Sequence, residues 1–113
     1  MGYNLEKINA ISDGDKDFIE AVVVAFIEEI PGDLETFESQ VQSRNYEGVY
    51  QISHKIKPNL ELLGMQESFD INLNILSWSK ARTNMDDIVT AFSDVQARIN
   101  ENIVELKKEF NLA

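Results

Sequence analysis

The stretch DDIVTAFSDVQARINENIVELKKEF, residues 86–110, carries large apolar side chains at intervals of three or four residues. These apolar positions are Ile88, Phe92, Val95, Ile99, Ile103, Leu106 and Phe110. Because an α-helix has about 3.6 residues per turn, such intervals place the side chains on one face of a helix. The stretch therefore predicts a long helix that packs lengthwise against other helices.

Five more helices are expected before this stretch, and the alternating pattern typical of strands is absent. Their expected ranges are about 3–11, 16–30, 31–44, 46–63 and 66–81. The side chains expected to face inward from the last three are Leu34, Phe37 and Val41, then Val49, Ile52, Ile56, Leu60 and Leu63, then Phe69, Leu73 and Leu76.

Residues typical of helix ends lie between these segments. The stretch SDGD, residues 12–15, is typical of a turn and N-cap, and Asn45 is a typical N-cap residue, because such side chains accept a hydrogen bond from the first helical turn. Pro31 suits the first turn of a new helix and so divides 16–30 from 31–44. Gly64 suits the end of a helix, where the backbone often turns left-handed.

Amphipathic helices joined by short turns are typical of an antiparallel bundle. We expect an all-α fold: an antiparallel four-helix bundle with a short N-terminal helix packed on it. A chain of 113 residues fits one domain, so residues 1–113 are expected to form a single domain.

Composition excludes several classes of function. The chain has no cysteine, which excludes disulfide scaffolds, Cys-ligated metal sites and thiol nucleophiles. Its formal net charge of −10 argues against nucleic acid or an anionic membrane as a partner. The longest apolar run, 21–27, is far shorter than a membrane span, and no signal-peptide pattern opens the chain. A cytoplasmic location is therefore expected.

The acidic charge is unevenly distributed. Residues 1–42 carry ten acids and two bases, and residues 83–113 carry six acids and three bases. Residues 43–82 carry four acids and five bases. The middle of the chain is therefore locally basic, and it contains the only histidine, His54.

Helix geometry predicts that His54 faces solvent. At about 100° per residue, it lies roughly 140° from the centre of the apolar face of 46–63. On the same side, Tyr50 lies one turn before His54, and Lys57 and Pro58 lie one turn after. Glu61 follows one turn later. An exposed histidine without a function is the other interpretation of this face.

The run AVVVAFI, residues 21–27, is apolar nearly all round its helix, although burial on one side needs only a stripe. Two interpretations remain open for this run. Either the helix is central in the bundle, or it exposes an apolar patch to a partner.

Most site chemistries lack their residues here. Di-iron bundles need several glutamates and two Glu-x-x-His pairs, and phosphate-binding loops and nucleophile elbows are absent. A Ser-His-Asp triad is not excluded, but Ser53 adjoins His54 on a helix and points elsewhere. Histidine as a covalent nucleophile remains, because a neutral imidazole accepts a phosphoryl group without a strong base.

The segment SHKIKPNLELLGM, residues 53–65, resembles the signature of histidine-containing phosphotransfer (HPt) domains. His54, Lys57 and Gly64 match that signature by spacing. The resemblance extends to Phe18, to FIEEIP at 26–31 and Leu34, and to NYE at 45–47, and so covers essentially the whole chain.

The resemblance implies a four-helix bundle that carries a phosphoryl group between aspartates of receiver domains. It implies that His54 is the phosphoacceptor, that Lys57 stabilises the phosphoryl group and that Gly64 ends the helix. It also implies a surface on which a receiver docks. The residues expected on this surface are Val22, Val23, Phe26, Ile27, Tyr50, Pro58 and Glu61.

The same resemblance implies the partners. They are response-regulator receiver domains and a hybrid histidine kinase, and the receiver brings the magnesium ion. The chain itself is expected to need no cofactor or metal, to have no turnover as an enzyme and to act as a monomer.

Pro58 departs from the family, which usually has glycine there. Proline inside a helix removes the amide that would bond to the carbonyl four residues back, here that of His54, and costs about 3 kcal/mol. We expect the helix to bend at this point. A tolerated kink without functional meaning is the other interpretation.

Two main alternatives to a phosphoryl carrier remain, ahead of an enzyme with turnover of its own, for which the sequence shows no substrate pocket. The first is an HPt-like docking module that binds a receiver or histidine kinase without being phosphorylated. The second is a structural bundle with an incidental surface histidine.

Overall fold

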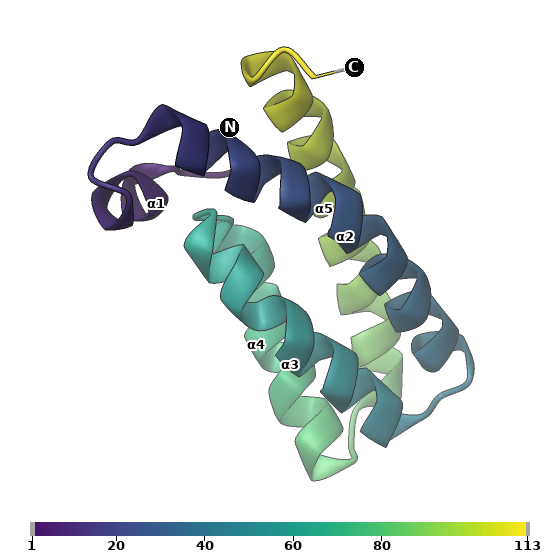
Figure 1. Cartoon of the computed structure of the whole chain (residues 1–113). Helices are drawn as coiled ribbons and strands as arrows, with labels where there is room; N and C mark the ends of the chain where they lie inside the picture. The colour runs from purple at the N-terminus through teal and green to yellow at the C-terminus, as the bar shows by residue number, and fades with distance from the viewer. Residues whose placement is uncertain (1, 113) are drawn as a thin grey trace.

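The computed structural model describes residues 2–112, so residues 1 and 113, the ends of the expected domain, lie outside the described part. Within residues 2–112 the chain forms helices and no strand. The helices are α1 (Glu6–Ile11), α2 (Lys16–Gln42), α3 (Tyr46–Leu62), α4 (Gln66–Ala81) and α5 (Met85–Glu109) (Figure 1). The prediction of an all-α fold is confirmed.

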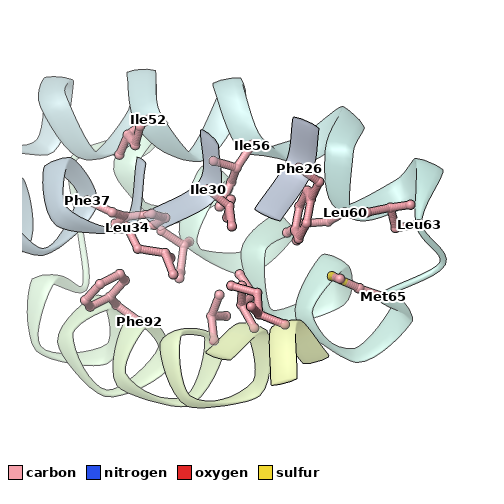
Figure 2. Packing of buried hydrophobic residues seen from close by; sticks show 14 of the residues in the cluster. Phe26, Ile30, Leu34, Phe37, Ile52, Ile56, Leu60, Leu63, Met65 and Phe92 are labelled. Atoms are coloured by element: carbon pink, nitrogen blue, oxygen red, sulfur yellow. The ribbon is translucent and has the colours of Figure 1, made fainter. Parts of the chain in front are cut away.

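The four long helices pack around a shared core. The main contacts join α2 to α3, α3 to α4, α4 to α5 and α5 to α2. The buried apolar side chains form one cluster to which all five helices contribute. At one point of this core the rings of Phe37 and Phe92 stack with their centroids 4.6 Å apart, which joins α2 to α5 (Figure 2). No helix within residues 2–112 has the length and apolar character needed to cross a membrane.

Helix α2 corrects the prediction of two helices at 16–30 and 31–44. Its buried apolar positions keep three- and four-residue steps on both sides of Pro31, the same order of steps as in α5. They are Ile19, Val23, Phe26, Ile30, Leu34, Phe37 and Val41. Pro31 is exposed and leaves the Ile27 carbonyl without its usual amide partner. The free energy gained by burying one continuous stripe of apolar side chains is larger than the loss from that one missing hydrogen bond.

The other predicted helix ends are close to those observed. The Asp15 side chain accepts a hydrogen bond from the Phe18 amide (3.1 Å), and that of Asn45 accepts one from the Gly48 amide (3.2 Å). Gly64 follows α3 with a φ of +61°. The first helix begins at Glu6 and not at residue 3, because the preceding segment bonds to the end of α3 through the Asn4 amide.

The apolar face of α5 lies in the core as predicted, with Phe110 half-buried at its end. The expected inward face of α4 is only partly observed, because Phe69 packs against the core but Leu73 does not. Leu73 is 37% exposed, and Phe69 and Leu76 are half-buried. The buried side chains of α4 are Ser68, Asn72, Ile75 and Ser79. Helix α4 therefore turns a mostly small and polar face inward, and hydrogen bonds to Ser53 of α3 make the burial of Asn72 possible.

Candidate functional site

The candidate site lies on the outer face of α3. The residues of its inner face are buried, namely Val49, Ile52, Ile56, Leu60 and, at the C-cap, Leu63. His54 lies on the opposite face and is exposed, as the helical periodicity predicted. Pro58, one turn further on, is exposed as well. The imidazole is therefore accessible to a partner.

Two side chains of α3 flank this imidazole. The ring of half-buried Tyr50 lies against it, with the ring centroids 5.9 Å apart and the planes 34° apart. Lys57 is half-buried, follows one helical turn later and forms no ion pair among residues 2–112. At this spacing along a helix its ammonium group lies within reach of the imidazole side chain.

Ser53 takes no part in this face. Its side chain is fully buried, and the hydroxyl donates a hydrogen bond to Oδ1 of Asn72 on α4 (2.7 Å). The amide Nδ2 of Asn72 donates in turn to the carbonyl of Ser53 (3.0 Å). This pair anchors the turn of α3 that carries His54, and it rules out Ser53 as a nucleophile activated by that histidine.

Lys55 lies on the side of α3 that faces α2. Its ammonium contacts Oδ1 of Asp33 (2.7 Å) and, more distantly, Oε1 of Glu29 (3.7 Å). The hydrogen bond that Lys55 donates to Asp33 is the main reason why the pKa of Lys55 is raised. Asp33 is buried, and its second oxygen, Oδ2, has no hydrogen-bond partner among residues 2–112. The two lysines near His54 therefore differ, because only Lys55 is held by carboxylates.

Glu61 is paired with a residue from the start of the chain. Lys7 on α1 donates to its Oε1 (2.5 Å), and both side chains are about half exposed. This hydrogen bond is the main cause that lowers the pKa of Glu61, and the charge of Lys57 lowers it further. Helix α1 therefore reaches the outer face of α3.

Two of the α2 residues that were expected on the docking surface are buried instead. Val23 is fully buried and Phe26 is only 6% exposed, because both belong to the continuous core stripe. Val22 and Ile27 are half-buried and remain on the surface. The run at 21–27 is thus partly central and partly exposed, and a partner for its exposed part stays a prediction.

A small hollow lies where this part of α2 meets α3. It has a volume of about 150 Å³. Its lining includes Val22 and Phe26 from α2 and Asn59 and Leu62 from α3. Val22 and Phe26, which the sequence placed on the docking surface, therefore meet at the α2–α3 seam.

Gly64 is required by its surroundings as well as by its backbone. A side chain at this position would place Cβ 2.2 Å from the carbonyl oxygen of Asn4. The amide of Asn4 also donates to the carbonyl of Leu63 (3.0 Å), so the N-terminal segment closes the end of α3. Sequence reasoning identified Gly64 but missed Asn4, Lys7, Asp33 and Asn72, because long-range contacts carry no local signal.

Within residues 2–112, no group of three or more His, Asp or Glu side chains is arranged to hold a metal ion. Compared with known proteins, the chain matches no family model, no curated protein and no solved structure. A functional assignment therefore depends on the residues of the α3 face and their geometry.

Proposed function

We propose that the protein is a histidine phosphotransfer protein of the HPt type, in which His54 carries a phosphoryl group between receiver-domain aspartates. The observation that carries the proposal is an exposed imidazole followed, one helical turn later, by a lysine that forms no ion pair among residues 2–112. On this proposal, α2 to α5 form the antiparallel four-helix bundle of that family, with α1 packed on it.

The reaction is a phosphoryl transfer from an aspartyl phosphate of the receiver. An unprotonated nitrogen of His54 attacks phosphorus, the bond to the aspartate oxygen breaks, and the carboxylate leaves with the electron pair. The remaining imidazole proton passes to solvent. Lys57 offsets the negative charge on the phosphoryl oxygens, and the receiver supplies the magnesium ion. The protein ends as a phosphorylated intermediate and has no turnover of its own.

The proposed receiver surface includes His54 and uses only side chains that reach the surface. It comprises Val22, Ile27, Tyr50, Pro58 and Glu61. We propose further that the protein acts as a monomer in the cytoplasm, with receivers and a hybrid histidine kinase as partners.

Incubation with a phosphorylated receiver domain and magnesium tests the proposal. We expect acid-labile phosphate on the wild type and none on His54→Gln, with the same helical content by circular dichroism. A receiver that binds the wild type without transferring phosphate would contradict the carrier role and favour the docking module. If several receivers neither bind the protein nor transfer phosphate to it, the result would favour a structural bundle.

A further inference from the structure

Glu61 and Lys57 do not form an ion pair with each other, although both lie on α3. The two residues are four apart on α3, a spacing at which opposite charges form ion pairs along a helix. Glu61 pairs instead with Lys7, which is 54 positions away in the sequence, and Lys57 has no ion pair among residues 2–112. Lys7 of α1 thus binds the carboxylate that is nearest to Lys57 along α3.

The structure holds α1 where it can make this contact. The amide of Asn4 donates to the carbonyl of Leu63, and the carbonyl of Asn4 lies against Gly64. Tyr3 donates a hydrogen bond to Glu109 (2.5 Å), and Ile8 of α1 is fully buried in the core. Lys7 therefore projects from an anchored segment.

We infer that Lys7 is a positioning residue for phosphoryl transfer: by pairing with Glu61, it keeps that carboxylate from capturing Lys57, whose ammonium group then remains available for the phosphoryl group. The inference rests on the proposed function and adds a residue from α1 to its site. Without Lys7, Glu61 would be free to pair with Lys57, and its charge would oppose an anion at His54.

Phosphoramidate is a suitable probe, because it labels histidine without a receiver and so separates the chemistry from docking. The imidazole nitrogen attacks phosphorus, the original P–N bond breaks, ammonia leaves, and the imidazole proton passes to water. We expect Lys7→Ala to slow labelling of His54 by about two- to fivefold, the range of exposed ion pairs. Lys7→Arg should label like the wild type.

The double variant separates this role from simple anchoring of α1. Lys7→Ala/Glu61→Gln should regain the wild-type rate, because the carboxylate that would compete for Lys57 is then absent. An anchoring role predicts the opposite, because each change breaks the same contact. In a Lys57→Met background, Lys7→Ala should have no effect. Lys108→Ala, which removes an exposed positive charge from the last turn of α5, is the matched control.

Equal labelling of Lys7→Ala and the wild type would overturn the inference. So would a Lys7→Ala defect that Glu61→Gln fails to rescue, or wild-type protein that phosphoramidate does not label at His54. Failure of the proposed function has a different signature: phosphoramidate would label His54, whereas no phosphorylated receiver would transfer to it.

Discussion

Ser53 and Asn72 exchange two hydrogen bonds across the contact between α3 and α4, one from the serine hydroxyl and one from the asparagine amide. Both side chains are fully buried. Since Ser53 precedes His54, this buried pair fixes the turn of α3 that presents the imidazole. Buried polar groups with complete hydrogen bonding define one arrangement of two helices more narrowly than apolar contacts do.

Asn72→Ala should lower the free energy of unfolding by about 1–3 kcal/mol, because it leaves the Ser53 hydroxyl and carbonyl buried without these partners. Urea denaturation would measure the loss. Asn74→Ala, an exposed position on the same helix, should change stability by less than about 0.5 kcal/mol. Equal stabilities for the two variants would contradict a structural role for the pair.

Gly64→Ala should destabilise the protein by about 1–2 kcal/mol from the left-handed backbone alone. The clash with the Asn4 carbonyl should add to that loss. Gly32→Ala is the matched control, because a Cβ in that turn of α2 meets no atom within 4 Å. It should stabilise the protein by about 0.5–1 kcal/mol through helix propensity. Thermal denaturation of both variants checks the opposite signs.

Pro58→Ala should stabilise the protein by up to about 3 kcal/mol, because it restores an amide that can bond to the carbonyl of His54. Helix α3 runs through Pro58 without interruption, so the expected bend at this point stays a prediction. Hydrogen exchange should show a protected amide at position 58 in the variant. Pro31→Ala makes the same chemical change in α2 and serves for comparison; rapid exchange of the new amide at 58 would argue against the restored bond.

Lys57→Ala should slow transfer from a phosphorylated receiver to His54 by about tenfold or more, because it removes the positive charge that offsets the phosphoryl oxygens. Rapid-quench measurement at several receiver concentrations would separate the transfer rate from receiver binding. Lys80→Ala, an exposed lysine on α4, should leave the rate unchanged. A similar loss in both variants would indicate a general effect of charge on docking.

The buried Tyr3 makes stability depend on pH in the alkaline range. Burial, followed by the hydrogen bond to Glu109, raises the pKa of its phenol above the ordinary value near 10. The folded state keeps this proton longer than the unfolded state does. The contribution of this phenol to the free energy of unfolding is therefore complete below pH 10 and is lost as the pH rises beyond it.

Tyr3→Phe removes this contribution. At pH 8 the variant should be less stable than the wild type by about 1 kcal/mol, the usual net value of one hydrogen bond. Between pH 10 and 11 the difference should shrink, as urea denaturation of both proteins would show. A difference that stays constant across this range would mean that the phenol titrates alike in both states.

Local patterns in the sequence were enough for the helical class of the fold and for the exposure of His54. Both follow from the helical repeat, since the spacing of apolar residues determines which face of a helix is buried. The N-caps at Asp15 and Asn45 and the stop at Gly64 depend only on residues within one turn, and they too were predicted correctly.

Contacts between segments far apart in the sequence determined the features that local patterns did not predict. Proline at 31 locally favours a new helix, but the stripe that continues through Leu34 gains more by staying on one axis. Helix α4 buries Asn72 and leaves Leu73 exposed because Ser53, nineteen residues away, satisfies the amide. Likewise Lys7 meets Glu61 only because the bundle brings α1 onto the end of α3. Such contacts depend on three-dimensional proximity, which no spacing along the chain encodes.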